Sequence, residues 1–308
     1  MQESGIVILG IFVADAAYRA DRQPRIGETI LGKGFALGPG GKGSNQAVAA
    51  ARLGSQVKFI TRIGDDAFAR MARDMWARDN IESLVVADPG SFTGSAYIFV
   101  DDATGNNAII VVPGAASDVG VQDIEQNADS IRDASIFMAQ FETPIDAAKR
   151  GMEIAKSSGT TTVLNPAPAA AVDRDLLELC DYLVPNESEA ETLTGMRVQT
   201  VEDAREASRA LREMGAKSVI VTLGENGALL NLGGECKHLA AFNAGPVVET
   251  TGAGDSFCGG FAHALLQGHT PYEATRYACA AASISVTRPG TAPSMPSADE
   301  VELLLSKL

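Results

Sequence analysis

Short runs of apolar and β-branched residues alternate along the chain with longer stretches whose apolar positions recur at helical spacing. This alternation is typical of a mainly parallel sheet that carries helices on both faces, so the pattern predicts the α/β class. The predicted strands are Ile6–Leu9, Val57–Arg62, Ser135–Phe141, Thr161–Leu164, Tyr182–Val184 and Ser218–Thr222. The predicted helices are Ser44–Leu53, Ala67–Asn80, Ile145–Ser158, Val201–Met214, Gly252–Leu266, Pro271–Val286 and Ser297–Leu308.

Two segments, residues 11–37 and 93–112, interrupt the alternation because both are β-like and neither contains a helical pattern. Glycine and proline turn signals punctuate them, and Ser95–Val100 and Ala108–Val112 are predicted to form a hairpin. The segments either extend the main sheet as antiparallel strands or form a small separate sheet that covers a cleft as a lid. We favour the lid, because both segments leave the main sheet at strand ends, where sites form in α/β proteins.

The composition is that of an ordinary globular protein, with 45% hydrophobic and 21% charged residues among 308. That length suits one large α/β domain or two smaller ones. The formal net charge of −14 repels phosphate backbones and anionic headgroups, so we expect neither nucleic acid nor a membrane surface as a partner. An anionic ligand is compatible with this charge if a local pocket of amides or basic side chains receives it.

The apolar run Ile6–Ala14 is short and is interrupted by Gly10, so we expect a buried first strand and neither a signal peptide nor a membrane span. A cytoplasmic protein whose four cysteines are reduced is the resulting expectation. No two cysteines have C-x-x-C spacing and the three histidines are scattered, which argues against a zinc site.

The first glycine-rich loop, residues 38–47, matches the glycine spacing of a dinucleotide-binding fingerprint. That fingerprint should follow the first buried strand of a domain, whereas this loop follows a turn-rich stretch. It is not a Walker loop either, because Gly41-Lys42 is followed by glycine where Ser or Thr would hold magnesium. The glycines expose backbone amides, and Lys42 and Asn45 offer donors at a helix start. The loop is therefore either a surface that reads hydroxyl groups or a structural turn that caps a helix.

The second glycine-rich loop, residues 249–257, leads into a predicted helix and places Gly252, Ala253 and Gly254 at its N-terminus. Unpaired backbone amides and the positive end of the helix dipole bind phosphate at such a terminus. Asp255 lies in the first turn, where a carboxylate is also favourable as a helix cap. A carboxylate beside an anion-binding amide cluster suits phosphoryl transfer, because it can take the acceptor proton while the amides stabilise the transferring group.

Asn186 and Glu189 follow the strand that ends at Val184, and their spacing puts both on the first turn of a helix. Asn at a helix start with Glu three residues later is also a capping pattern. The functional alternative is that they orient Mg²⁺ through water, since that ion keeps several waters and takes few protein carboxylates. The residues alone leave both interpretations open.

Six motifs, in the same order along the chain, resemble the ribokinase branch of the PfkB carbohydrate-kinase family. These motifs are Gly40–Ala47, Asn165–Ala169, Pro185–Glu191, Thr222–Gly224, Thr251–Asp255 and Thr287–Gly290. The resemblance covers essentially the whole chain. It implies a three-layer α/β sandwich with a mainly parallel central sheet and a small β-sheet lid, in one ribokinase-like domain over residues 1–308. It also implies a homodimer that forms through the lids.

The resemblance also implies a role for individual positions. It makes Asp255 the catalytic base and the amides of Gly252, Ala253 and Gly254 an anion hole. The positions that match the sugar site are Asp15, Gly41, Lys42, Asn45 and Glu142. Those that match the nucleotide side are Asn186, Thr222, Gly224 and Gly227, with Glu189 near Mg²⁺. A K⁺ site beside the anion hole would draw on Glu249, Thr251, Arg288, Gly290 and Ser294.

Two positions depart from the family pattern. The family usually has Asn two residues before the sugar-binding Asp15, and this chain has Val13, which cannot hydrogen-bond a hydroxyl. An unpaired buried hydroxyl costs about 1–3 kcal/mol, enough to change sugar preference by roughly one or two decades. Deoxyribokinase-like relatives also place an apolar residue there, so 2-deoxyribose is an alternative acceptor. Glu249 stands where the family commonly has Asp, and its extra methylene could displace a potassium ligand.

The sequence thus predicts ATP-dependent phosphorylation of a pentose, with D-ribose converted to D-ribose 5-phosphate as the leading hypothesis. Asp255 would accept the hydroxyl proton, the amides and Mg²⁺ would stabilise charge, and lid closure would exclude water. Another sugar or a nucleoside such as adenosine is an alternative acceptor. A non-catalytic sugar or nucleotide sensor would be expected to lack Asp255 or Lys42, and both are present. A nicotinamide-dependent oxidoreductase is the other rival, motivated by the glycine spacing of the first loop.

Overall fold

Two sheets make up the computed structural model, which describes residues 5–307. The larger sheet has the strand order β13-β12-β11-β10-β9-β8-β1-β4-β5. Neighbouring pairs from β11 to β5 are parallel, and β12 and β13 add antiparallel strands at one edge. These strands are β1 (Ile6–Leu9), β4 (Val57–Ile63), β5 (Glu82–Ala87), β8 (Ile136–Ala139), β9 (Thr161–Leu164), β10 (Tyr182–Leu183), β11 (Ser218–Thr222), β12 (Ala228–Leu232) and β13 (Glu235–Leu239).

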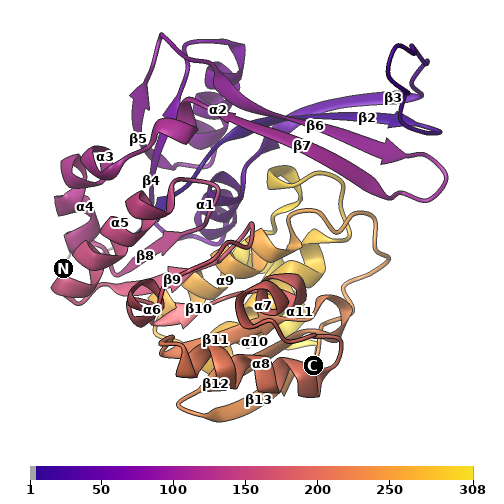
Figure 1. Ribbon diagram of the computed structural model, residues 1–308. Helices are drawn as coiled ribbons and strands as arrows, with labels where there is room; N and C mark the ends of the chain where they lie inside the picture. The colour runs from indigo at the N-terminus through magenta and orange to yellow at the C-terminus, as the bar shows by residue number, and fades with distance from the viewer. Residues whose placement is uncertain (1–4, 308) are drawn as a thin grey trace.

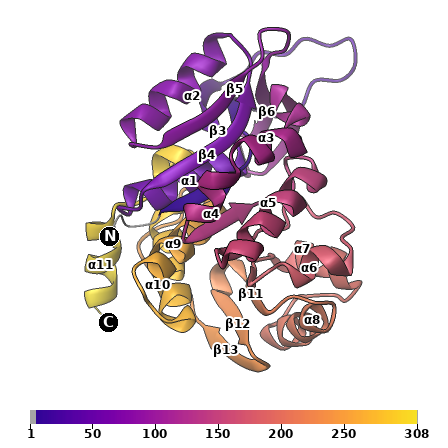
Figure 2. The same ribbon diagram turned by 90° about the vertical axis from the view of Figure 1, so that its left-hand side faces the viewer.

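The central strands of this sheet are buried on both faces, as their near-continuous apolar runs predict. In β1, Ile6 and Ile8 belong to one hydrophobic cluster, while Val7 and Leu9 belong to another. Successive side chains of a strand point to opposite faces, so each face of the sheet has its own core. The sheet is therefore the middle of three layers (Figures 1 and 2). The predicted three-layer sandwich with a mainly parallel sheet is confirmed.

Helices cover both faces of the large sheet, and Figure 2 shows the two groups on opposite sides of the strands. The first face carries α1 (Lys42–Arg52), α2 (Ala67–Arg78), α9 (Ala253–Leu266), α10 (Pro271–Ser285) and α11 (Ala298–Ser306). The second face carries α3 (Val121–Gln126), α4 (Ala128–Asp133), α5 (Ile145–Ser158), α6 (Arg174–Glu178), α7 (Glu187–Thr194) and α8 (Val201–Glu213). Single 3-10 turns occur at Ala115–Asp118, Gly224–Asn226 and Ala292–Ser294.

The smaller sheet has the order β3-β2-β6-β7 and is built from the two segments that interrupt the α/β alternation. Its strands are β2 (Val13–Ala20), β3 (Gly34–Gly40), β6 (Thr93–Asp101) and β7 (Asn107–Gly114). β2 and β6 pair in parallel, and the two outer pairs are antiparallel. Figure 1 shows these long strands projecting away from the body of the molecule. A separate sheet, as predicted, is therefore confirmed, and the alternative of an antiparallel extension of the large sheet is wrong.

The predicted strands and helices are present, with their ends displaced by a few residues. The predicted strand Ser135–Phe141 is shorter in the structure because the chain leaves the sheet after Ala139. Leu308, the predicted end of the last helix, lies outside the described residues. Strands β5, β12 and β13 and the short helices α3, α4 and α6 had not been predicted. β13 shows the reason, since this edge strand is mostly exposed and has no apolar run.

Helices α1 and α9 approach each other unusually closely, and Gly259 makes this possible. A Cβ atom at Gly259 would lie 2.5 Å from Ala49 Cβ and 2.7 Å from the carbonyl oxygen of Gln46. Asp255 precedes Gly259 by four residues, so both lie on the same side of α9. The glycine contact therefore brings the N-terminal turns of α9 against the middle of α1.

We predict that Gly259→Ala lowers the free energy of unfolding by about 1–3 kcal/mol, because an added methyl group overpacks this contact. Urea denaturation followed by circular dichroism measures the change. Gly38→Ala is the control, since a Cβ at Gly38 of β3 would meet no atom within 4 Å. Equal unfolding midpoints for the Gly259→Ala variant and the wild type would contradict the close-packing argument.

Candidate active site

A cavity of about 500 Å³ lies between the two sheets and contains many of the residues that the sequence singled out. Eight predicted site residues line it: Asp15, Gly41, Lys42, Asn45, Glu142, Thr251, Gly252 and Asp255. Apolar side chains of the smaller sheet, such as Val13, Ile98 and Val111, line it as well. The cavity therefore combines charged and polar residues, most of them from the body of the large sheet, with apolar side chains of the smaller sheet.

The fold explains why residues so distant in sequence meet here. Gln140–Glu142 follow the carboxyl end of β8, and α1 and α9 present their N-terminal ends to the same region. The carboxyl ends of parallel strands share one edge of a sheet, and loops at that edge form the sites of α/β proteins. Asp15 comes from β2 of the smaller sheet, which follows β1 directly.

Gly41 shapes the start of α1. It has φ 93°, a left-handed conformation that favours glycine, and a Cβ there would overlap the carbonyl oxygen of Ile11. The tight turn directs the backbone NH of Lys42 to Glu142 Oε2 at 2.7 Å. The first glycine-rich loop therefore connects to α1 as expected, and it holds the carboxylate of Glu142 with a backbone amide.

Asp255 is the buried centre of the site, with 7% of its surface exposed. Asn45 Nδ2 donates to Asp255 Oδ2 at 3.0 Å, and Gln46 Nε2 donates to Asp255 Oδ1 at 3.1 Å. The alternative that Asp255 only caps its helix is not supported, because the N-cap of α9 is Gly252 and its side-chain partners are on α1. Burial raises the pKa of Asp255, while Lys42, Asn45 and Gln46 act in the opposite direction.

Lys42 supplies positive charge to this cluster of acids. Burial acts to lower the pKa of Lys42, but the negative charges around it, Asp255 first and then Glu142 and Glu189, together raise its pKa above the ordinary value. The ammonium group is therefore charged at neutral pH. It neutralises part of the repulsion among the carboxylates that line the cavity.

Asp15 and Glu142 have unusual protonation behaviour. Burial, followed by repulsion from Asp255 and Glu249, raises the pKa of Asp15 to about 7. Burial, followed by repulsion from Asp255 against the opposing charge of Lys42, raises the pKa of Glu142 to about 7. Both carboxyl groups therefore change charge near neutral pH when no ligand fills the cavity.

The N-terminus of α9 presents backbone NH groups toward the cavity region. Gly252 is the N-cap in a left-handed conformation with φ 84°. Ala253 N donates to the carbonyl oxygen of Thr250 at 3.2 Å, so this amide already has an intramolecular partner. Within residues 5–307, the NH groups of Gly252 and Gly254 have no such partner, and a Cβ at Gly254 would meet open space. These two amides are suited to bind an anion.

The predicted nucleotide residues do not line the 500 Å³ cavity, among the residues that the structure describes. Asn186 and Thr222 form a parallel β-bridge at the carboxyl ends of β10 and β11. Asn186 and Glu189 form a capping box, with Glu189 N donating to Asn186 Oδ1 at 2.8 Å. The capping interpretation of this pair is therefore correct, and any ligand role is additional to it. Burial raises the pKa of Glu189.

Gly224 begins the 3-10 turn after β11, and Gly227 follows this turn directly, near the same edge of the sheet. Leu223 N donates to the carbonyl oxygen of Gly227 at 2.8 Å and closes this turn. The structure thus groups the nucleotide candidates at neighbouring strand ends, beside the cavity that contains Asp255.

The predicted cation residues lie around the loop between α10 and α11. Glu249 Oε2 accepts from Gly290 N at 2.8 Å, and Ser294 Oγ donates to the carbonyl oxygen of Thr291 at 2.7 Å. The Arg288 side chain forms an ion pair with Glu300. Arg52 Nη1 donates to the carbonyl oxygens of Ala292, Pro293 and Met295, at 2.9, 3.2 and 3.3 Å.

Sequence reasoning gave no role to three polar residues near Asp255: Gln46 and Gln140, which are buried, and Asn165, which is partly buried. Gln46 and Asn165 belong to motifs that carry the family resemblance, yet no side-chain function was derived for them. For Gln46 the available signal was its place on the buried face of a helix, where a polar side chain needs hydrogen-bond partners. Thr291 also lines the cavity without having been predicted.

Comparison with known proteins agrees with this geometry. Residues 3–298 match the family described as pfkB family carbohydrate kinase. The chain belongs to the PfkB family. A ribokinase of Haemophilus influenzae is 36% identical over 296 residues, which is 96% of each chain. A deoxyribokinase of Salmonella typhi is 37% identical over 303 residues, which is 98% of each chain.

A solved structure of Arabidopsis thaliana ribokinase, complexed with ribose and ATP, is similar to this PfkB protein throughout its fold. The TM-score is 0.88 at 32% identity, and the match covers 98% of both chains. The ribokinase-like fold is therefore established for this chain.

Among residues 5–307, no helix is long and apolar enough to cross a membrane. No cluster of three His, Cys, Asp or Glu side chains suited to a metal occurs in that part of the kinase.

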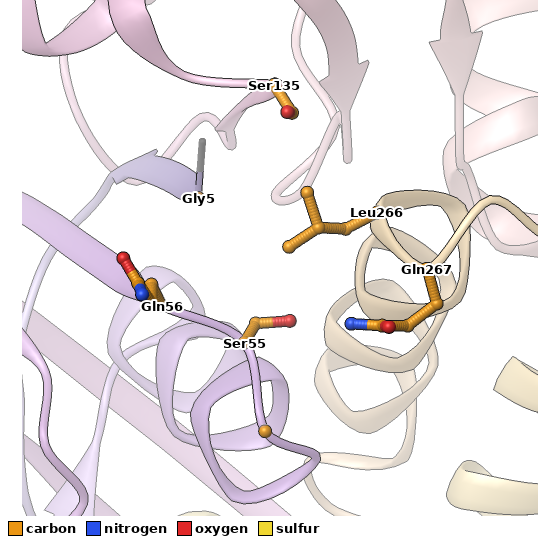
Figure 3. A pocket seen from close by; sticks show the side chains of 7 residues that line it. Gly5, Ser55, Gln56, Ser135, Leu266 and Gln267 are labelled. Atoms are coloured by element: carbon orange, nitrogen blue, oxygen red, sulfur yellow. The ribbon is translucent and has the colours of Figure 1, made fainter. Parts of the chain in front are cut away.

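A second, smaller cavity of about 180 Å³ lies away from the candidate residues. Gly5 and Ser135, which precede β1 and β8, contribute to it, so it lies at the amino ends of the parallel strands. Figure 3 shows Ser55, Leu266 and Gln267 pointing toward one another across it. No residue predicted for the kinase site lines this cavity.

The raised pKa values of Asp15 and Glu142, each about 7, predict how the stability of this PfkB protein depends on pH. Between roughly pH 4 and pH 7 the folded state binds more protons than the unfolded state, so the free energy of unfolding falls as pH rises. We expect Asp15→Asn to reduce this fall by about 1–3 kcal/mol, since one pKa unit corresponds to about 1.4 kcal/mol. Urea unfolding at pH 5 and pH 8 measures it.

Asp129→Asn is the matched control, because the side chain of Asp129 is 95% exposed and lies outside the cavity. If Asp15→Asn and the control showed the same pH dependence as the wild type, the carboxyl group of Asp15 would not be desolvated as described.

Proposed function

We propose that this chain is an ATP-dependent sugar kinase that transfers the γ-phosphoryl group of ATP to O5 of D-ribose. The single observation that carries the proposal is the buried carboxylate of Asp255 beside the unpaired amides of Gly252 and Gly254, at the end of a cavity between two sheets. Membership of the PfkB family supports it, as do relatives named ribokinase and a similar structure with ribose and ATP.

The sugar binds in the 500 Å³ cavity, where its hydroxyl groups meet both donors and acceptors. Asp15 and Glu142 accept hydrogen bonds from hydroxyl groups, while Lys42 and Asn45 donate to them. Gly41 has no side chain, so the ligand can approach the backbone. Filling the cavity also replaces water, which strengthens these interactions.

Asp255 then acts as the general base. Its carboxylate takes the O5 proton as O5 attacks the γ-phosphorus; the new O5–P bond forms while the bond to the β-phosphate oxygen breaks and ADP leaves. The amides of Gly252 and Gly254 donate to the transferring phosphoryl oxygens, which carry most of the charge in the transition state. Ala253 was expected to contribute a third amide, and this would require it to exchange its hydrogen bond to Thr250.

ATP lies along the strand ends beyond the cavity, in this proposal, with Asn186, Thr222, Gly224 and Gly227 on the nucleotide side. Their grouping at the ends of β10 and β11 supports this placement. The phosphate chain then points toward the N-terminus of α9, where the macrodipole favours negative charge.

Mg²⁺ fits at Glu189, through water. A carboxylate offers about four lone-pair sites, and Glu189 accepts three hydrogen bonds, from Asn186 N, Asn186 Nδ2 and Asn165 Nδ2, at 2.9, 3.0 and 3.5 Å. A water molecule of the ion can therefore still donate to it. When bound with ATP, the ion supplies charge neutralisation at the β- and γ-phosphates.

K⁺ fits less well. The carboxylate of Glu249 lies at the expected loop, but it accepts a hydrogen bond from Gly290. The carbonyl oxygens of Ala292, Pro293 and Met295 accept hydrogen bonds from Arg52, and the Ser294 hydroxyl is donated to Thr291. The predicted ligands left for the ion are the carboxylate of Glu249 and the carbonyl oxygens of Thr251, Arg288, Gly290 and Ser294. We derive no step of the reaction from this ion.

The chain is proposed to act as one domain, with segments 11–37 and 93–112 as its lid. Apolar residues on the cavity side of the smaller sheet, among them Ile98, Ile109 and Val111, support this role because they cover the sugar site and exclude water. A cytoplasmic location and the absence of nucleic-acid or membrane partners remain predictions from the sequence.

The opposite side of the smaller sheet supports a homodimer formed through the lids. Tyr18, Phe35 and Ile110 are 44%, 60% and 64% exposed. The ring of Tyr18 packs against Phe35 and Tyr97, at centroid distances of 5.0 and 5.7 Å, so the aromatic side chains form one exposed patch. Exposed apolar patches of this kind mark protein interaction sites, and a second copy of the chain offers the same surface.

We expect Ile110→Lys to shift the protein toward a monomer, because the lysine would have to bury its charge in the dimer contact. Size-exclusion chromatography with light scattering measures the mass. Leu232→Lys is the control, since Leu232 is an exposed apolar residue of β12, which belongs to the large sheet and not to the proposed dimer contact. A wild-type protein that is monomeric at micromolar concentration would exclude the proposed dimer.

A second acceptor, 2-deoxyribose, is favoured by one specific observation. Val13 lines the cavity with 3% of its surface exposed and cannot hydrogen-bond a sugar hydroxyl. A deoxyribokinase of 37% identity is also among the relatives. The main hypothesis remains ribose, and the ratio of kcat/KM for the two sugars distinguishes them.

ADP release with ribose, 2-deoxyribose, fructose and adenosine tests the function. We predict the highest kcat/KM with ribose, and a loss of kcat by roughly 10²- to 10⁴-fold in Asp255→Asn, which keeps the shape of the side chain and removes the base. The sugar affinity of this variant, measured by calorimetry, should change much less than its kcat.

Ser44→Ala is the control for the fold of α1, because Ser44 accepts a hydrogen bond from Trp76 and does not line the cavity. Near-native turnover by Asp255→Asn with sugar still bound would show that another group is the base. No ADP release with any of the four acceptors would reject the proposed function as a whole.

A further inference from the structure

Two hydrogen-bonded side-chain amides, one buried and one partly buried, connect Asp255 with Glu189. Gln46 Nε2 donates to Asp255 Oδ1 at 3.1 Å and to Asn165 Oδ1 at 3.2 Å. Asn165 Nδ2 in turn donates to the carbonyl oxygen of Val184 at 2.9 Å and to Glu189 Oε2 at 3.5 Å. The carboxylates of Asp255 on α9 and Glu189 on α7, which the proposed reaction needs, are thus connected through Gln46 of α1 and then Asn165.

Every hydrogen-bonding group of the Gln46 side chain has a partner. Its two NH donors go to Asp255 and Asn165, and its Oε1 accepts from Gln140 Nε2 at 2.7 Å. The orientation of the amide is unique, because a flipped amide would turn Oε1 toward the oxygen atoms of Asp255 and Asn165 and its NH₂ group toward the NH₂ group of Gln140. A side chain that is 0% exposed and has three such partners is held in one rotamer.

Gln46 does not line the substrate cavity, whereas its neighbour Asn45 does. The two residues share Asp255, since Asn45 binds Oδ2 and Gln46 binds Oδ1. Asn45 is therefore placed to contact both the ligand and the carboxylate, while Gln46 can act only through the carboxylate. Because Gln46 does not contact the ligand, an effect of its replacement on kcat indicates a role in positioning Asp255, not in binding the sugar.

We propose that Gln46 is a positioning residue, which fixes the plane of the Asp255 carboxylate and, through Asn165, the position of Glu189 relative to it. The inference rests on the proposed function, because it assigns Asp255 and Glu189 to the same reaction. With Oδ1 held by Gln46, the carboxylate cannot rotate about its Cβ–Cγ bond, and Oδ2 is kept at the cavity. Misplacement of a reacting group by about 1 Å costs on the order of 10²-fold in rate.

The test is Gln46→Met, which keeps the length of the side chain and removes the donors. We expect kcat with ribose and ATP to fall roughly 10- to 100-fold, because the geometry of the base is relaxed. KM for both substrates should change by less than about threefold, since only an interaction outside both binding surfaces is lost. Partial unfolding of the variant would also lower kcat, because it would reduce the fraction of active protein. Titration with ribose measures this fraction as the number of binding sites per protein molecule.

The pH profile of kcat gives a second readout. Gln46 lowers the pKa of Asp255, so its removal should move the acidic limb of the profile to higher pH. The charged groups that face Asp255 from neighbouring elements remain in the variant: Asp15 of β2, Lys42 of α1, Glu142 after β8 and Glu189 of α7. A purely structural role for Gln46 would leave the limb where it is.

Two further variants complete the experiment. Ser44→Ala removes another buried hydrogen bond of α1, to Trp76 at 3.0 Å, and should lower thermal stability with kcat unchanged. Asn165→Leu tests the connection between Gln46 and Glu189. The fall in kcat of the Gln46→Met/Asn165→Leu variant should be smaller than the product of the two single falls, because both substitutions break the same connection. If Gln46→Met does not fold, Gln46→Leu takes its place.

Wild-type kcat and an unshifted acidic limb in the folded Gln46→Met variant would overturn this inference and leave the proposed function intact. Multiplicative losses in the double variant would overturn the part that links Gln46 to Glu189. Failure of the proposed function has a different signature, since the wild-type protein itself would then release no ADP with any sugar.

Discussion

The structure depends on keeping an ionisable carboxylate, Asp255, in a place that water hardly reaches. Such a charge is costly to bury unless hydrogen bonds and an opposite charge compensate it. Two amides of α1 and the ammonium group of Lys42 provide this compensation. The remaining burial still raises the pKa of Asp255, so the carboxylate binds a proton more readily than one in water. The proposed general base, which would have to accept a proton and later release it, would benefit from that balance.

The division into two sheets follows from the same requirement. Residues attached to the large sheet have fixed positions, because helices pack against both faces of this sheet. Several apolar residues of the smaller sheet line the cavity or lie exposed, while others, such as Ala14 and Phe99, are buried elsewhere. A wall that is only weakly packed against the body is suited to move, whereas the residues around Asp255 are not. In the proposed function, the general base would thus belong to the rigid body, and the smaller sheet would enclose the sugar.

The sequence predicted most of the large sheet, because buried parallel strands have continuous apolar runs and the helices between them have clear periodicity. Exposed edge strands such as β13 lack that signal. The charged residues of the cavity were identifiable through motifs, since glycine loops and helix starts are local features. The partners of Asp255 on α1 were not, because Gln46 and Asp255 are 209 positions apart and meet only through helix packing. Capping at Asn186 was recognisable for the opposite reason, as both partners lie within one turn.

Helix α1 has distinct attachments along its length. Its first residue binds Glu142 through the backbone, Asn45 and Gln46 hold Asp255, and Arg52 near its end holds the loop at Ala292–Met295. Each residue added to a helix rotates everything beyond it by about 100°. A single insertion or deletion between Lys42 and Arg52 would therefore turn one set of attachments away from its partners, whereas conservative replacements change one contact at a time. The length of this segment is consequently constrained by all of these attachments at once.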